Sequence, residues 1–249
     1  MDQYTRSRIM KEKDFRKDCL LTDSPVLARQ TAARGLPVIY YERPGAEPVY
    51  EADYTVQSLD DLDELFFQRV YERHYGLPWC IGETERLKIR ESTEEDVEKL
   101  LELFSDAEAV RWLFDEEKEN YSREEQREKL EAYVRNRYAF FGYGFYSVLL
   151  KTTGELAAWA GFQEREYHGK TVLEFGYLTA AAFRKQGIAT EAAGILVREM
   201  EELTGETQAY LFCHPDNQPS RRTAEKLCAL YPEHFQTVVD QEKADSRKL

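Results

Sequence analysis

The sequence predicts an α/β fold in which a small βαββα segment precedes a larger domain with a mixed, mostly antiparallel sheet flanked by helices. In residues 1–82 short strand-like runs alternate with helical ones, which favours parallel strands. In residues 145–178 three strand-like runs follow one another without a helix between them, which favours antiparallel pairing. A chain of 249 residues also exceeds the usual domain length of about 100–200. We therefore expect two domains, residues 1–82 and 83–249.

The first segment contains short elements separated by turn residues. Ser24 can cap a helix with Pro25 in its first turn, and Gly35 suits a left-handed helix end. A linker is expected over residues 76–82, which include Gly76, Pro78 and Gly82. The predicted elements are a strand at 19–21, a helix at 26–34, strands at 37–41 and 54–56, and a helix at 62–75.

This order of elements resembles the distal half of a haloacid-dehalogenase-like Rossmannoid domain, over residues 1–80. In that family a strand ending in Asp-Ser precedes a helix, a glycine and another strand, as Asp23 and Ser24 do here. The phosphatases of the family use an aspartate nucleophile with a second aspartate two residues later, a position that Pro25 occupies. Capping and helix initiation are therefore the expected roles of Asp23 and Ser24.

The larger domain starts with a strand, and Ser92 followed by Glu95 predicts a capping box at the first helix. A polar, acidic stretch at 115–120 separates this helix from the next, and Thr153 with Gly154 predicts a turn. A charged tail follows from residue 241. The predicted elements are a strand at 87–90, helices at about 93–104 and 123–138, strands at 145–150, 156–163 and 172–178, a helix at 187–203, a strand at 209–213, a helix at 219–230 and a strand at 235–239.

Composition excludes several classes of function. A net charge of −13 repels polyphosphate, so no nucleic acid partner is expected, and an acidic surface favours cationic acceptors or serves solubility alone. The four cysteines form no CxxC pair and no cluster with histidine, so neither a metal nor a disulfide framework is expected. No apolar leader or spanning segment is evident, which favours a cytoplasmic protein without membrane contact.

One motif is typical of a phosphate-binding loop. Arg184, Lys185, Gln186, Gly187, Ile188 and Ala189 stand between a predicted strand and the helix that follows it. A pyrophosphate needs several backbone N–H groups directed into one concavity, and a helix N-terminus provides them together with a favourable dipole. Gly187 and Ala189 allow the backbone to approach the phosphates, while Arg184 and Lys185 add positive charge. The alternative is an ordinary basic turn before a helix.

Three linked blocks resemble the GNAT N-acetyltransferase family over about residues 84–231. They are the strand at 173–178, the loop at 184–189, which matches Q/R-x-x-G-x-G/A, and the Asn-x-x-Ser segment with Asn217 and Ser220. The nearest branch is the ribosomal-protein-alanine acetyltransferase-like (RimJ/RimL-like) one. The resemblance implies acetyl-coenzyme A as co-substrate, held by this loop, by the strand backbone at Tyr177, Leu178 and Thr179, and by Asn217 at a pantetheine amide.

The resemblance also implies roles in acetyl transfer to an amine. The Leu178 N–H would stabilise the developing oxyanion, and Glu174 would act as general base through water. Glu164 and Glu166 are alternates, and Glu174 could instead pair with a neighbouring Arg or Lys. Many members carry a tyrosine acid seven residues after the asparagine, but that position is Ala224, so Ser220 is the candidate acid unless it only caps the last helix.

We therefore expect an acetyl-coenzyme A-dependent N-acetyltransferase that acetylates a primary amine of a small molecule or a peptide N-terminus. The amine would attack directly in a ternary complex. The family's closing hairpin is reduced to one strand, which favours a homodimer. The alternative is a non-catalytic acyl-coenzyme A-binding regulatory module, suggested by the missing tyrosine and the shortened end.

Overall fold

The structure is a computed structural model that describes residues 15–60, 62–112 and 121–239. The acidic stretch at 115–120 and the charged tail from residue 241 lie outside the described residues. The chain separates into two compact units, residues 1–79 and 80–249.

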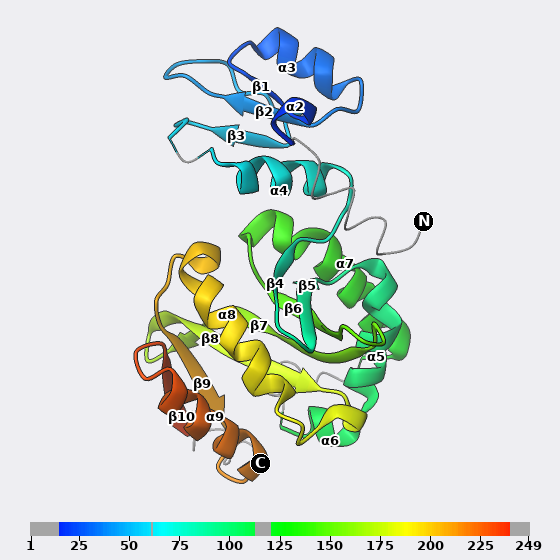
Figure 1. Cartoon of the computed structure of the whole chain (residues 1–249), viewed down its shortest axis with the longest axis vertical. Helices are drawn as coiled ribbons and strands as arrows, with labels where there is room; N and C mark the ends of the chain where they lie inside the picture. Colours follow the sequence, from blue (N-terminus) through cyan, green and yellow to red (C-terminus); the bar gives the residue numbers. More distant parts are fainter. Residues whose placement is uncertain (1–14, 61, 113–120, 240–249) are drawn as a thin grey trace. The chain divides into compact units, whose positions relative to one another are not determined.

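The first unit is a three-stranded parallel sheet in the order β1-β2-β3 with a helix on each face (Figure 1). The order matches the expected βαββα pattern, with a short preceding helix that is too brief to leave a periodic signal. Ile39 packs with Phe67 and Val70 of α4, while Val38 and Tyr40 pack with α3. The elements are α2 Phe15–Asp18, β1 Leu20–Thr22, α3 Pro25–Ala32, β2 Val38–Tyr41, β3 Tyr54–Val56 and α4 Glu64–His74.

The second unit is built on a seven-stranded sheet in the order β10-β9-β8-β7-β6-β5-β4. Neighbouring strands from β4 to β8 are antiparallel, whereas β8, β9 and β10 run parallel. The predicted mixed, mostly antiparallel sheet is therefore confirmed. The strands are β4 Cys80–Glu83, β5 Leu87–Glu91, β6 Phe145–Leu150, β7 Leu156–Tyr167, β8 Lys170–Thr179, β9 Ala209–Cys213 and β10 Phe235–Val239.

Two local predictions are corrected. Residues 80–82, expected to be part of a linker, belong to β4, which pairs with β5 and buries Ile81. The capping box lies one residue later than expected, because the Asp96 carboxylate accepts the Thr93 N–H at 2.8 Å. Ser92 is instead buried, and its hydroxyl lies 2.9 Å from that of Ser147.

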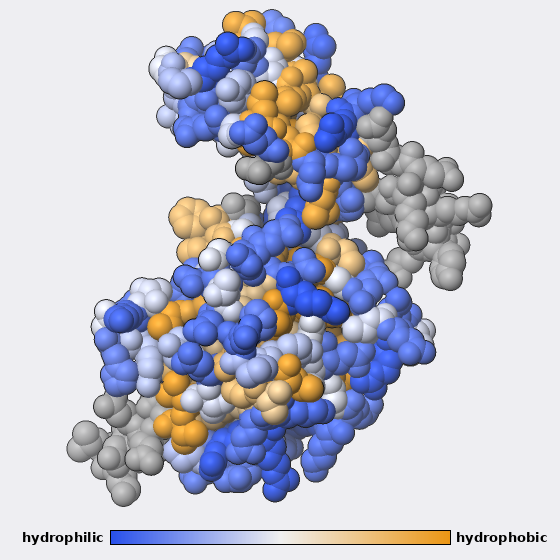
Figure 2. Space-filling model, turned by 60° about the vertical axis from the view of Figure 1, so that its left-hand side comes forward, coloured by the Kyte–Doolittle hydropathy of each residue, from blue (hydrophilic) through white to orange (hydrophobic). Residues whose placement is uncertain are grey.

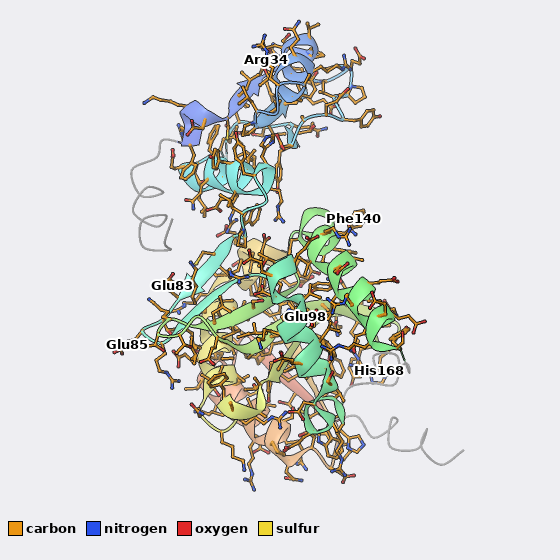
Figure 3. All side chains as sticks on the ribbon, turned by 90° about the vertical axis from the view of Figure 1, so that its right-hand side faces the viewer. Arg34, Glu83, Glu85, Glu98, Phe140 and His168 are labelled. Atoms are coloured by element: carbon orange, nitrogen blue, oxygen red, sulfur yellow. The ribbon has the colours of Figure 1, made fainter. Side chains whose placement is uncertain are left out.

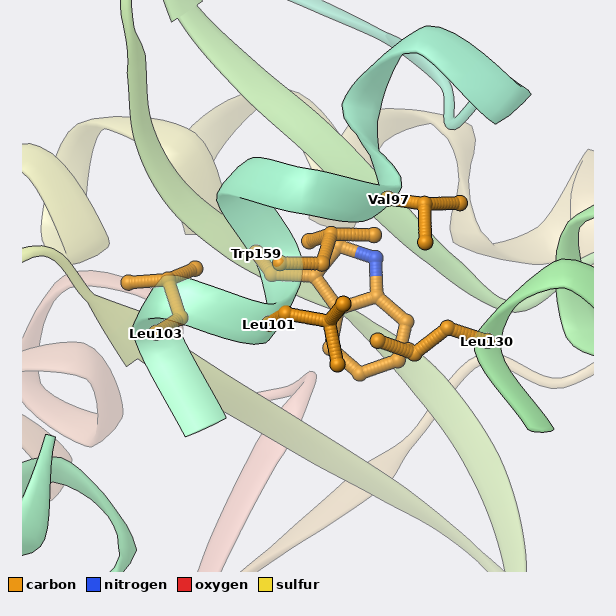
Figure 4. Close-up of a cluster of buried hydrophobic side chains, with 6 residues drawn as sticks. Val97, Leu101, Leu103, Leu130 and Trp159 are labelled. Atoms are coloured by element: carbon orange, nitrogen blue, oxygen red, sulfur yellow. The ribbon is translucent and has the colours of Figure 1, made fainter. Parts of the chain in front are cut away.

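Helices cover both faces of this sheet. In Figure 1, α8 and α9 lie in front of it, while α5 and α7 lie on the opposite face. Val97, Leu101 and Leu103 of α5 meet Leu130 of α7 and Trp159 of β7 in one buried cluster (Figure 4). The helical elements are the 3-10 turn η1 Glu94–Asp96, α5 Val97–Ser105, α6 Ala107–Val110, α7 Arg123–Phe141, the 3-10 turn η3 Ala181–Phe183, α8 Ile188–Thr204 and α9 Gln218–Leu230.

The surface of the second unit is mostly hydrophilic in the view of Figure 2, with scattered apolar patches. Such a surface agrees with a chain in which 33% of the residues are charged. Among the helices that the structure describes, none is both long and apolar enough to cross a bilayer.

Candidate functional site

The neighbouring parallel strands β8 and β9 separate from each other. They share a single register pair, Glu174 with Tyr210, whereas β7 and β8 are paired continuously from Ala158–Thr179 to Tyr167–Lys170. Beyond Glu174 the edge of β8 has no register partner in β9. The sheet is therefore open where these two strands end, and an extended ligand could pair with the β8 backbone there.

A cavity of about 400 Å³ occupies this opening. The side of the cavity toward α9 includes Cys213, Asn217 and Ser220, and the side toward α5 and α7 includes Phe104 and Tyr133. Glu174, Tyr177 and Leu178 of β8 also line it, so the structure brings these three predicted residues together with Asn217 and Ser220.

Two glycines on neighbouring strands permit the close packing beside this cavity. A Cβ added at Gly161 would lie 2.1 Å from the Gly144 carbonyl oxygen, and one at Gly176 would lie 2.9 Å from the Phe145 ring. The Phe145 ring in turn packs on Trp159, with ring centroids 4.8 Å apart. Glycine at both positions lets an aromatic wall lie directly on the sheet.

The loop predicted to bind phosphate connects η3 to α8. Gly187 adopts a left-handed conformation (φ 78°) at the N-cap of α8, and Lys185 is also left-handed (φ 62°). No heavy atom lies within 4 Å of a Cβ built on Gly187, so its backbone is open to a ligand. The first N–H groups of a helix lack intrahelical partners, and α8 therefore presents donors at Ile188 and Ala189.

Arg184 makes contacts that the sequence did not predict. Its guanidinium lies 2.6 Å from an Asp106 carboxylate oxygen and 2.9 Å from one of Glu108, and its Nε donates to the Thr179 carbonyl at 3.3 Å. This side chain thus links the loop to α6. Backbone N–H groups and the exposed Lys185 remain as the groups of the loop that are available to phosphate.

Glu174 is buried and engaged by neighbours from β7. One oxygen lies 3.1 Å from Nη1 of Arg165, and the other accepts a hydrogen bond of 3.1 Å from the Gln163 amide. The Arg165 guanidinium also stacks over Phe212 of β9, 4.1 Å from the ring centroid. Glu174 therefore lines the cavity and also forms a buried ion pair. The sequence had left both roles open, a site residue or a partner of a neighbouring Arg or Lys.

The alternate carboxylates do not reach the cavity. Side chains alternate across a strand, so Gln163 and Arg165 share one face of β7 while Glu164 and Glu166 occupy the other. Glu164 accepts from the Tyr143 hydroxyl and pairs with Arg137 at 2.9 Å. Burial opposes its ionisation, but these two partners lower the pKa of Glu164 overall. Its place on the other face of β7 keeps it away from an amine in the cavity.

Ser220 does not cap the last helix. Asn217 is the N-cap of α9, and its side-chain oxygen accepts the Ser220 N–H at 3.2 Å. The Ser220 hydroxyl is thereby left to the cavity side, 3.4 Å from the Cys213 sulfur. The Tyr177 hydroxyl interacts with Thr223 and Ser220, and burial raises the pKa of Tyr177. Burial likewise raises the pKa of the Cys213 thiol.

Several lining residues were missed from the sequence. Gln163 of the lining and Arg165, which pairs with Glu174 without lining the cavity, could have been found by continuing the two-residue period from Trp159 along β7. Trp112, Tyr121 and Lys129 left no signal, because their place on the cavity depends on how the α6 and α7 regions pack. No group of side chains suited to hold a metal ion occurs among the residues that the structure describes.

Comparisons with known proteins agree on one family. Residues 86–228, more than half of the chain, match the family model described as an acetyltransferase (GNAT) domain. No curated protein matches the sequence.

Solved structures of acetyltransferases are similar to part of the chain. A GNAT-family acetyltransferase from Bacillus anthracis is 24% identical, with a TM-score of 0.45, over 58% of this chain and 80% of that one. A putative GNAT-family acetyltransferase from Bordetella pertussis is 22% identical, with a TM-score of 0.47, over 59% and 86%. A Salmonella typhimurium acetyltransferase that modifies the N-terminal serine of a 50S ribosomal subunit protein is 22% identical, with a TM-score of 0.47, over 60% and 83%.

Proposed function

This chain belongs to the GNAT acetyltransferase family, and from that premise we propose that it transfers an acetyl group from acetyl-coenzyme A to a primary amine. The acceptor would be a small molecule or a peptide N-terminus. The separation of β8 and β9 beyond the Glu174–Tyr210 pair carries the proposal, because it opens a cavity on the strand that leads into the loop at 184–189.

The residues present fit an acyl-coenzyme A. The open backbone at Gly187 and the N-terminus of α8 would hold its pyrophosphate, and Lys185 would add positive charge. The backbone groups of Tyr177 and the Thr179 N–H, which point away from β7, would pair with the pantetheine arm, with Asn217 at one amide. The backbone groups of Leu178, expected to take part, point toward β7 instead. When bound, the coenzyme supplies an activated acetyl thioester.

Residues of the chain would then accept the proton of the amine and donate a proton to the leaving thiolate. Glu174 is the carboxylate among the described lining residues, and we assign it the proton of the acceptor amine. Arg165 and Gln163 hold this carboxylate in place against the cavity. The Ser220 hydroxyl, freed from helix capping by Asn217, is assigned as the donor to the leaving thiolate. The Leu178 N–H, expected to donate to the oxyanion, points toward Trp159 of β7 in the antiparallel register and is therefore not assigned that role.

Calorimetric titration with acetyl-coenzyme A tests the proposal. We expect the wild-type chain to bind, and Gly187→Glu to lose binding because it places a negative charge where phosphate should lie. Gly205→Glu is the matched control, since Gly205 ends the same helix, is also left-handed (φ 74°) and has no atom within 4 Å of an added Cβ. Both variants carry the same backbone strain.

The outcomes separate the possible functions. Loss of binding in Gly187→Glu alone supports the site and justifies a screen of amines. No binding by the wild-type chain would reject the acetyltransferase assignment. Binding without acetylation of any amine would favour the non-catalytic acyl-coenzyme A-binding alternative.

A further inference from the structure

The cavity wall on the α5 and α7 side is predominantly aromatic. Phe104, Trp112, Tyr121 and Tyr133 line it, together with Trp159 of the sheet. The rings of Phe104 and Tyr133 pack edge-on against Trp159, with centroid distances of 5.6 Å and 5.2 Å. Interlocked rings of this kind form a fixed apolar surface, which gains free energy by covering an apolar ligand.

Charged groups on the described part of the lining are few. Glu174 is the one acidic residue there, and Arg165 and Gln163 already bind it. The ammonium of Lys129 lies 3.3 Å from the centroid of the Tyr121 ring. A ligand with several ammonium groups would bring them beside the Lys129 ammonium, without a further carboxylate on the described lining to pair with.

We infer that the acceptor is a monoamine whose amino group is carried on an apolar body of about the size of one aromatic ring. The inference rests on the proposed acetyl transfer and adds the class of acceptor. The Trp112 ring, which packs against His214 at a centroid distance of 4.8 Å, is the residue that selects this body. This acceptor class differs from the strongly cationic acceptors that a net charge of −13 favours.

The test compares two acceptors on the full chain, 2-phenylethylamine and spermidine, by the rate of coenzyme A release. We expect kcat/KM for 2-phenylethylamine to exceed that for spermidine by about tenfold or more. Trp112→Ala should lower kcat/KM for 2-phenylethylamine by about tenfold, mainly through KM. Trp112→Phe should restore most of it, and neither variant should change the calorimetric Kd for acetyl-coenzyme A.

Phe140→Ala is the matched control, because Phe140 is an 81% exposed aromatic residue of α7 (Figure 3) that does not line the cavity. It should leave both rates unchanged.

Preference for spermidine, or equal loss in Trp112→Ala for both amines, would overturn the acceptor class while acetyl transfer stands. Acetylation of neither amine by a chain that binds acetyl-coenzyme A would overturn both the proposed transfer to such amines and this inference.

Discussion

Ser220 is a hydroxyl that the fold places on the cavity without using it to cap a helix. Its neighbours are Cys213 and the Tyr177 hydroxyl. We expect Ser220→Ala to lower kcat by about a hundredfold, the usual effect of losing a general acid, with no change in the Kd for acetyl-coenzyme A. Steady-state kinetics and calorimetry measure the two quantities. A large loss in Tyr177→Phe with little effect of Ser220→Ala would transfer the acid role to the phenol.

Arg184 forms ion pairs with carboxylates of the protein itself, so we expect it to contribute to stability more than to phosphate binding. Arg184→Ala should destabilise the fold by about 0.5–1 kcal/mol, since it breaks partly exposed ion pairs with Asp106 and Glu108. Lys185→Ala should affect stability less and acetyl-coenzyme A binding more. Urea denaturation and calorimetry test this pair of variants. Equal losses of binding would mean that Arg184 also serves the phosphates.

Residue roles could be predicted from sequence only where the partner is close along the chain. The loop with Gly187 before α8 was expected from local spacing and occurs there, whereas the cap of α9 was considered for Ser220 and is Asn217, three residues earlier. The carboxylate partners of Arg184 lie more than 70 positions earlier in the chain, and the partners of Glu174 come from another strand. Such contacts depend on register and packing, which a single sequence does not reveal.

At the scale of elements, the close packing of the paired strands β6, β7 and β8 depends on two glycines. Gly161→Ala should cost about 3 kcal/mol of unfolding free energy, because the new Cβ would meet backbone atoms of Gly144 that cannot move aside. Gly176→Ala should cost about 1 kcal/mol, since the Phe145 ring can shift. Urea denaturation of both variants measures the difference. The reverse order of costs would contradict this account of the packing.

The junction of β5, η1 and α5 predicts a dependence of stability on pH. Burial opposes ionisation of Asp96, but hydrogen bonds and charge from Arg90 lower its pKa below the ordinary value of 3.8. A group whose folded pKa is depressed stabilises the fold above its unfolded pKa and loses that contribution as pH falls through the folded value. Stability should therefore fall as the pH drops below the ordinary value of 3.8.

Asp96→Asn should flatten this acid limb, as measured by urea denaturation between neutral and acid pH. Glu102→Gln is the control, because Glu102 forms an exposed ion pair with Lys99 on α5 and should change the profile little. An unchanged acid limb in Asp96→Asn would show that other carboxylates control it.

Element order was largely predictable because long periodic runs and turn residues mark it. The antiparallel series β6, β7, β8 and the parallel first sheet both follow from such patterns. Strand β4 was not predicted because Cys80–Glu83 is short and follows Gly76 and Pro78, which resemble a linker. The separation of β8 from β9 has no sequence pattern of its own, so the cavity could be expected only through the family resemblance.

At the scale of the whole molecule, the net charge and the cavity lining favour different acceptors. A charge of −13 describes the field around the chain, whereas an acceptor meets the rings and the occupied carboxylate of the cavity. Long-range charge influences the rate of encounter and weakens with salt, while the lining decides what stays bound. For acceptors of equal charge, high ionic strength should therefore change the rate of association more than the preference between them, as kcat/KM at low and high salt can measure.

The described lining of the cavity comes from the second unit alone. The sheet from β4 to β10 and all described lining residues lie within residues 80–249. Residues 80–249 produced alone should therefore fold and bind acetyl-coenzyme A with the Kd of the full chain, as calorimetry can measure. Gly187→Glu in this shorter chain should abolish binding, as it should in the full chain. Weaker binding by an otherwise folded second unit would show that residues 1–79 contribute to the site, and failure to fold would show that they contribute to stability.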